Sequence, residues 1–279
     1  MIIDFRIRPT TVFTGVPIYD PNFSKHSISI GAEPIESVKQ NSLELLIQEM
    51  KEAGITKGVI MGRQAGVKSG SVPNEKIAEV VQKYPDYFIA FAGVNPLNIN
   101  AALKEITKAI NELGFKGVSV DPGFADEPLK ADDRRLYPIY AKCEELGVPV
   151  SITTSIFVGP DVSYSMPASI HRVANDFPDL QIIVPHAAWP WVNEILGVAF
   201  ITNNVWLSPD LYINIPNMPG ATHFVEAANY YLGDRMLFAS AYPIRSLKQS
   251  VSDFMRLPIK EDVKEKILYK NAIRLLRLE

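Results

Sequence analysis

The chain has 279 residues, of which 47% are hydrophobic and 21% charged, a composition typical of a folded, enzyme-sized protein. No stretch approaches the roughly 18 consecutive apolar residues of a membrane span. The 28 basic and 31 acidic residues give a net charge of −3, without the basic field that holds nucleic acid. We therefore expect neither membrane insertion nor nucleic-acid binding. Cys143 is the single cysteine, which excludes an internal disulfide, and the first residues lack a secretory pattern, so we expect a cytoplasmic protein.

Short apolar or β-branched runs alternate with amphipathic stretches along the whole chain, as in proteins built from βαβ units. The runs predict eight strands, at residues 2–7, 57–61, 88–94, 117–121, 148–153, 181–186, 205–210 and 236–241. Eight strands, nearly all followed by a helical pattern, favour a closed (β/α)8 TIM barrel over an open doubly wound sheet. We predict an α/β protein with one barrel domain over residues 1–279.

Helix boundaries and two long intervals complete this pattern. Ser42 is expected to begin a helix that stops at Gly54, and Asn98 one that ends near Gly114. The intervals 9–41 and 122–136 both follow strands, so they are expected on the catalytic face of the barrel, as lids or substrate-contacting loops.

The interval 9–41 is expected to cover the barrel mouth and to form a contact between subunits. Apolar residues within it would otherwise face water: Ile18, Tyr19, Phe23 and Ile28. We therefore expect a homo-oligomer, a dimer being the simplest form.

Polar side chains stand where the predicted strands end, which is where a parallel barrel carries its chemistry. They are Arg6 and Arg8 on the first strand, Arg63 after the second, and then Asp121, His186, Asp210 and Tyr242 at later strand ends. Arg6 and Arg8 are expected to point to the barrel axis, with Phe5 and Ile7 facing the helices. A single arginine or aspartate at a strand end is as often part of a structural ion pair as it is functional. Two carboxylates cannot neutralise three arginines, so an anionic substrate group is the favoured partner.

His186 follows an apolar strand and precedes two tryptophans, so we interpret it as a functional imidazole rather than a hydrogen-bonded core histidine. Trp189 is a candidate wall of the pocket, although an aromatic residue at a helix start is as often simple packing. No glycine-rich phosphate loop follows any strand, which argues against a nucleotide cofactor.

Five segments together resemble the amidohydrolase-related family, which includes aminocarboxymuconate semialdehyde decarboxylase, resorcylate-type decarboxylases and pyrone dicarboxylate lactonase. The segments are IIDFRIRP, DDRRLYPIYAKCEELGVPVSI, DLQIIVPHAAWPW, RMLFASAYP and KEKILYKNAIRLL. The resemblance covers essentially the whole chain and implies a metal-dependent barrel fold. It does not specify the activity, because the family contains both hydrolases and decarboxylases.

The metal-ligand motif of that family is changed in this chain. Arg6 and Arg8 stand at the two histidines of its Asp-x-His-x-His motif, Thr153 at a strand-five histidine and Ala241 at a strand-eight aspartate. His186 matches the strand-six histidine, which the resemblance implies is an acid or base near the reacting centre. Because zinc needs three or four N, O or S donors, we predict a metal-free site without cofactors. Asp4 is expected to pair with an arginine of the mouth.

These features favour a metal-independent hydrolase of a small carboxylated substrate, such as a lactone, with a small anionic metabolite as the binding partner. In this hypothesis Arg6, Arg8 and Arg63 bind the anion together with Tyr242 and Trp189, His186 is the acid or base, and Asp121 or Asp210 orients or activates water. A non-oxidative decarboxylase is the first alternative, in which His186 or Asp121 protonates the carbanion. A non-catalytic anion-binding barrel is the second. Release of carbon dioxide, or binding without turnover, separates these alternatives.

Overall fold

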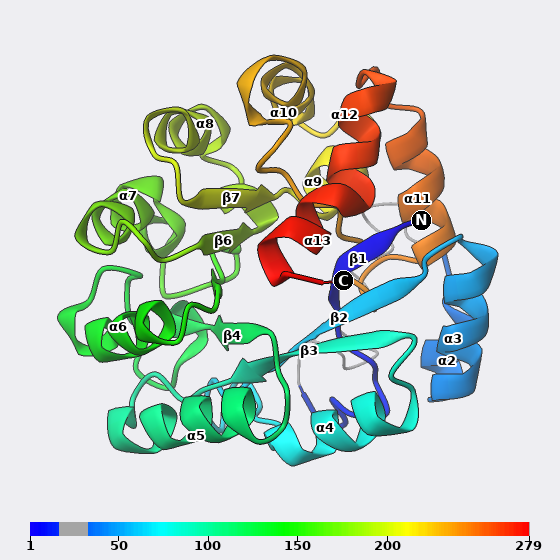
Figure 1. The fold of residues 1–279 in the computed structure, drawn as a ribbon. Helices are drawn as coiled ribbons and strands as arrows, with labels where there is room; N and C mark the ends of the chain where they lie inside the picture. The colour runs from blue at the N-terminus through cyan, green and yellow to red at the C-terminus, as the bar shows by residue number, and fades with distance from the viewer. Residues whose placement is uncertain (17–32, 279) are drawn as a thin grey trace.

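A computed structural model describes residues 1–16 and 33–278 and contains a curled sheet of seven parallel strands in sequential order (Figure 1). The strands are β1 (Ile3–Ile7), β2 (Lys57–Met61), β3 (Phe88–Gly93), β4 (Gly117–Val120), β5 (Val150–Ile152), β6 (Ile182–Pro185) and β7 (Val205–Ser208). Each lies within a predicted strand. Sequential order with parallel pairing is the arrangement of a (β/α)8 barrel, so the predicted fold is confirmed.

The predicted eighth strand, 236–241, closes the barrel between β7 and β1, although its pairing is irregular. Leu237 donates its N–H to the Leu207 carbonyl, and Phe5 donates to the Phe238 carbonyl, both at 2.9 Å. Single parallel bridges join Leu207 to Met236 and Ile7 to Tyr242. These bridges do not form a continuous ladder, and the backbone leaves the extended conformation at Ala241, whose φ is 61°.

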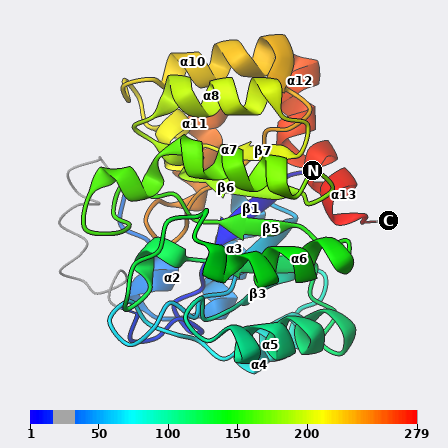
Figure 2. The same ribbon diagram turned by 90° about the vertical axis from the view of Figure 1, so that its left-hand side faces the viewer.

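Helices surround the strands on the outside of the barrel (Figures 1 and 2). They are α2 (Glu36–Lys39), α3 (Leu43–Glu52), α4 (Asn74–Lys83), α5 (Ile99–Asn111), α6 (Tyr137–Glu145), α7 (Pro167–Asp176), α8 (Val192–Ile201), α9 (Leu211–Asn214), α10 (Ala221–Ala227), α11 (Leu247–Met255), α12 (Glu261–Glu265) and α13 (Asn271–Leu276). Short 3-10 helices are η2 (Pro122–Phe124), η3 (Arg134–Leu136), η4 (Val162–Ser165) and η5 (His186–Ala188), and π-type turns are η6 (Ala228–Leu232) and η7 (Lys266–Lys270).

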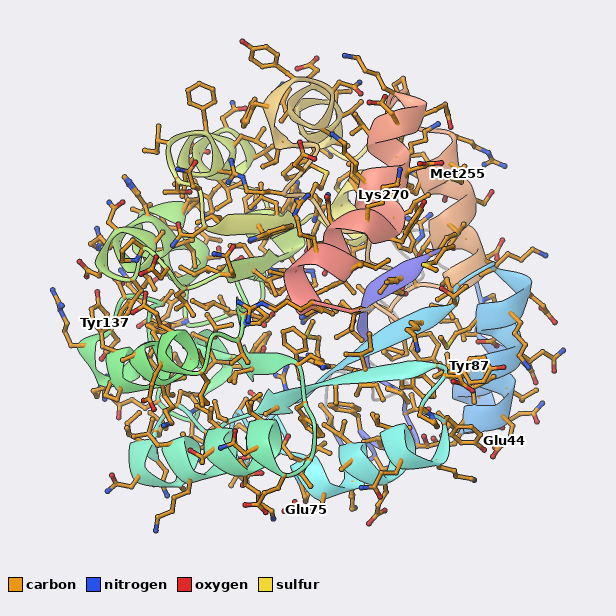
Figure 3. The ribbon with its side chains drawn as sticks, in the orientation of Figure 1. Glu44, Glu75, Tyr87, Tyr137, Met255 and Lys270 are labelled. Atoms are coloured by element: carbon orange, nitrogen blue, oxygen red, sulfur yellow. The ribbon has the colours of Figure 1, made fainter. Side chains whose placement is uncertain are left out.

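The predicted helix starts are confirmed. The Ser42 hydroxyl accepts from Leu45 N–H, and the Asn98 side chain accepts from Ala101 N–H, so each caps its helix. Glu44 and Glu75 lie on the outer surface of the helical layer (Figure 3). Within the described residues, no helix combines the length and apolar character needed to cross a membrane.

The inside of the barrel is filled by its own apolar cluster, which contains Phe5, Phe91, Leu237 and residues of α13. Helix α13 crosses one end of the barrel and closes it (Figure 1). The expectation that Phe5 faces the helices is therefore wrong, whereas Ile7 does pack outward, in a cluster with Met50 of α3. Alternation in β1 is regular from Ile3 to Phe5, which both belong to the interior cluster. The change follows Phe5: Asp4 pairs with Gly58 and Ile7 with Ile60, so β1 contains one extra residue and Ile7 turns outward.

The two long intervals have more local structure than expected. The interval 9–41 contains α2, and 122–136 contains η2 and η3. The apolar residues proposed to form a subunit contact, Ile18, Tyr19, Phe23 and Ile28, lie outside the described residues.

Gly62 follows β2 at a place where two backbones touch. A Cβ atom there would lie 2.1 Å from the Gly93 amide nitrogen, a contact with main chain that no side-chain rotation relieves. We expect Gly62→Ala to lower the free energy of unfolding by about 3 kcal/mol. Gly197→Ala is the matched control, because nothing lies within 4 Å of a Cβ on this residue of α8, and it should raise stability by up to about 1 kcal/mol. Denaturant unfolding of both variants tests this; equal effects would contradict it.

Candidate active site

The carboxyl ends of the strands lie at the end of the barrel opposite α13 and the chain termini (Figure 2). There Asp121, after β4, contacts two arginines through one oxygen. Its Oδ2 lies 3.3 Å from Arg8 Nη2 and 3.3 Å from Arg63 Nη1. All three side chains are buried. Burial raises the pKa of Asp121, but the two guanidiniums outweigh it and the pKa falls to about 2, so this carboxylate stays ionised.

Main-chain carbonyls and an aromatic ring hold the two arginines in fixed orientations. Arg8 Nε donates to the Met61 carbonyl at 3.0 Å, and Arg63 Nε donates to the Ser69 carbonyl at 2.9 Å. The Arg63 guanidinium also lies 4.5 Å from the centre of the Phe124 ring, a cation–π contact. Asp121 thus organises a rigid cationic pair.

The third arginine belongs to a second group, built around Asp210 after β7. Asp210 Oδ2 lies 3.5 Å from Arg6 Nε and 3.2 Å from His186 Nδ1, while the Ser208 hydroxyl donates to the other oxygen. Burial raises the pKa of Asp210 to about 6, although Arg6 opposes this shift. Burial, Arg6 and Arg8 together hold the pKa of His186 well below its ordinary value, so its imidazole is neutral at pH 7.

The backbone is strained where this group is assembled. His186, Ala187 and Ala188 have φ values of 62°, 40° and 51°, and Asp210 has a φ of 53°. Non-glycine residues in the left-handed region cost on the order of 1–3 kcal/mol each, and such residues concentrate at functional sites. The strain sets the directions in which the imidazole and the carboxylate leave the backbone.

An aromatic pair lies beside the imidazole. Trp189 and Tyr212 stack with ring centres 4.8 Å apart and planes 8° apart, and Tyr212 meets the His186 ring edge-on at 5.9 Å. Trp189 thus lies beside His186, and its indole N–H donates to the Pro219 carbonyl at 3.0 Å. Tyr212 was not among the candidate residues; its position two residues after Asp210 was the available signal.

Tyr242 does not join the group. Its hydroxyl lies 2.9 Å from Ser37 Oγ, and Ser37 donates to Glu49 of α3, so the ring lies in the outer layer between the barrel and the helices. The expected contact of Tyr242 with substrate is therefore not supported. The left-handed backbone at Ala241 turns the chain here, which the strand pattern could not predict.

The expected pairing of Asp4 also differs from the structure. Its Oδ1 accepts hydrogen bonds from the main-chain N–H groups of Arg6 at 3.1 Å and Ser240 at 3.0 Å, rather than from an arginine side chain. The carboxyl is fully buried, and this burial raises its pKa to about 7. Asp4 therefore supports the backbone of the site.

The residues at the family's metal positions do not fit a divalent cation. Arg6 and Arg8 offer only donors, and their positive charge repels a cation. Over residues 1–16 and 33–278, no three His, Cys, Asp or Glu side chains are grouped as a metal would need. His186 and Asp210 lie in contact there and could supply two ligands. Zinc usually takes at least three protein ligands.

Comparison with known proteins agrees with this fold. Residues 30–278 match the amidohydrolase family model, and the chain belongs to this family. It is 30% identical to 2-keto-4-carboxy-3-hexenedioate hydratase from Sphingobium sp., over 73% of this chain and 71% of that protein. It is 23% identical to gamma-resorcylate decarboxylase from Rhizobium sp., over 79% of each. An uncharacterised TIM-barrel protein from Bordetella bronchiseptica superposes with a TM-score of 0.94 at 44% identity, over 99% of this chain and 98% of that one. The family resemblance is thus confirmed.

The raised pKa of Asp4 predicts a particular dependence of stability on pH. The folded state keeps the Asp4 proton up to about pH 7, whereas the unfolded chain loses it near the ordinary value of 3.8. The free energy of unfolding should therefore fall as pH rises from about 4 to about 7, on the order of 4 kcal/mol from this group.

Asp4→Asn tests this because the amide cannot ionise. Its fall in stability between about pH 4 and pH 8 should be smaller than that of the wild type by this amount. Asp210, whose pKa is raised to about 6, remains in both proteins. Denaturant unfolding at both pH values measures the difference; identical pH dependence in the two proteins would contradict the prediction.

Proposed function

We propose that this protein adds water to a small carboxylated substrate, a lactone being the first class to test, without a bound metal. The observation that carries the proposal is the 3.2 Å contact between His186 Nδ1 and Asp210, at the same barrel end as three buried arginines. Hydrolysis and hydration of such a substrate both need a base that removes a proton from water and a site that binds the substrate carboxylate. This arrangement provides both.

His186 acts as the base in this proposal. Its imidazole is neutral at pH 7 because burial and two arginines lower its pKa. In this scheme the proton is on Nδ1, 3.2 Å from Asp210 Oδ2, and the Nε2 lone pair takes a proton from water. Asp210 then stabilises the imidazolium that forms, as the third group of a hydrolase triad does.

The arginines hold the substrate and the charge that develops on it. The substrate carboxylate binds at the cationic pair of Arg8 and Arg63, whose guanidinium planes suit carboxylate oxygens. Arg6 stabilises the oxyanion formed when water attacks the lactone carbonyl. The ring C–O bond then breaks, and His186 returns its proton to the leaving oxygen, which gives a hydroxy acid. In this scheme Asp121 positions the arginines and does not activate water.

Decarboxylation is the second candidate, favoured by the relatives named as decarboxylases. It needs a group that protonates a carbanion, and a histidine with a lowered pKa is a poor donor at pH 7. Arginines paired with a carboxylate also stabilise the reactant more than neutral carbon dioxide. Both arguments favour water addition. Hydration of an unsaturated keto acid, supported by the named hydratase, uses the same base and anion site.

A panel of carboxylated lactones and unsaturated keto acids tests the reaction. We expect a hydroxy acid product that carries oxygen from labelled water, without release of carbon dioxide. His186→Gln should lower kcat by roughly 100-fold to 10,000-fold, because it removes the base. His223→Gln is the matched control, because His223 is on the outer helix α10, and it should keep wild-type rates. Carbon dioxide release would favour the decarboxylase, and binding without turnover would favour an anion-binding barrel.

Metal independence has its own test. Protein purified without added metal should contain well under one equivalent of zinc, manganese or iron, because two guanidiniums a few ångströms away repel a divalent ion by several kcal/mol at an effective dielectric near 20, in order of magnitude. A chelator should change neither the melting temperature nor the activity. One tightly bound equivalent whose removal abolishes activity would overturn this part of the proposal.

A further inference from the structure

Two irregularities face one another where the barrel closes. Between Asp4 and Ile7, β1 contains one residue more than the paired stretch of β2 from Gly58 to Ile60. On its other side, Phe5 N–H donates to the Phe238 carbonyl and Arg8 N–H to the Tyr242 carbonyl, so the closing segment has one residue more than β1 over the same stretch. Regular parallel pairing would advance both chains equally.

One buried oxygen serves both irregular places. The N–H groups of Arg6 and Ser240 both donate to Asp4 Oδ1, at 3.1 and 3.0 Å. Buried N–H groups without an acceptor are costly, so the bulge is stable only while this acceptor is present. Asp4 itself is fully buried.

The extra residue determines where Arg6 points. Phe5 and Arg6 are adjacent, yet Phe5 lies in the barrel interior and Arg6 Nε reaches Asp210 Oδ2 at 3.5 Å. If β1 returned to regular pairing, every following side chain would shift to the opposite face of the sheet. Arg6 would then leave Asp210, and the contact between Asp210 and His186 would lose its cationic neighbour.

We propose that Asp4 is a positioning residue: it holds the bulge in β1 through its Oδ1 acceptor and so keeps the Arg6 guanidinium on Asp210 beside His186. The negative charge of Asp4 is not required, since its donors are the main-chain N–H groups of Arg6 and Ser240 and the Ser240 side chain, all of them uncharged. The importance of Asp4 for catalysis rests on the proposed role of His186. Its effect on the position of Arg6 does not depend on that role.

The test measures the titration of His186 by NMR in the full chain, without substrate. The His186 resonance is assigned with His186→Gln. The charged groups that face this imidazole are Arg6 and Arg8, which lower its pKa, Asp121, which raises it, and Asp210, whose Oδ2 lies 3.2 Å from Nδ1. In Asp4→Ala, departure of Arg6 should raise the His186 midpoint by about one pH unit. Asp4→Asn keeps the oxygen acceptor and should titrate as the wild type does.

Ile139→Ala is the matched control for loss of stability, because Ile139 is fully buried on α6, in the cluster between the strands and the outer helices. Its His186 midpoint should not move. Once a substrate is known, Asp4→Ala should lower kcat/KM by about tenfold or more, with recovery in Asp4→Asn. Failure to find any substrate would count against the proposed function and leave the NMR result intact.

Three results would overturn the proposal. The first is an unchanged His186 midpoint in folded Asp4→Ala, and the second is a shift in Asp4→Asn equal to that in Asp4→Ala. If Asp4→Ala does not fold, Asp4→Ser takes its place, since its shorter side chain cannot reach both N–H groups. If neither variant folds while Ile139→Ala does, Asp4 supports the whole barrel and a specific role in positioning Arg6 is rejected.

Discussion

Burial of three guanidinium groups at one end of the barrel constrains everything around them. A charge removed from water costs several kcal/mol unless close partners replace its hydration. Two carboxylate oxygens supply the opposite charge: Asp121 Oδ2 contacts Arg8 and Arg63, and Asp210 Oδ2 contacts Arg6 and His186. Each oxygen is shared, so the positions of both partners depend on the same side chain. The site is therefore a coupled unit rather than a set of independent side chains.

The two aspartates respond differently to similar burial. Asp121 has two guanidinium nitrogens at 3.3 Å and its pKa falls to about 2, whereas Asp210 has one at 3.5 Å and its pKa rises to about 6. Environments that separate the pKa values of paired groups divide their roles. A permanently ionised Asp121 suits the organisation of an anion site. Asp210 and a neutral His186 suit proton transfer near neutral pH.

Much of this arrangement could be predicted from the sequence, because barrel topology brings strand ends together whatever the loops do. The alternation of apolar runs placed seven strands within their observed bounds, and the strand ends identified the arginines, Asp121, Asp210 and His186 as neighbours. Helix caps at Ser42 and Asn98 followed from local chemistry alone. Each of these features depends on residues close in sequence or on topology.

The features that could not be predicted depend on register. A single extra residue in β1 lets Phe5 lie in the interior while Ile7 packs outward, and the left-handed backbone at Ala241 precedes the turn of Tyr242 toward Ser37. Strand periodicity assumes an unbroken period of two, and a bulge breaks it without a local signature. The bulge in this chain is held by an oxygen of Asp4 and an amide 236 residues away, so only the closed barrel reveals it.

Arginine in place of metal-binding histidine changes which chemistry the barrel can support. A metal ion in such a barrel both fixes charge and lowers the pKa of bound water toward 7. A guanidinium supplies the fixed charge and can stabilise an oxyanion, but it keeps its proton and cannot deliver hydroxide. In the proposed metal-free reaction, a protein side chain removes the proton from water. His186, neutral because the same arginines lower its pKa, is the imidazole that they surround. In the proposed reaction, the arginines at the family's metal-ligand positions thus also keep the base neutral.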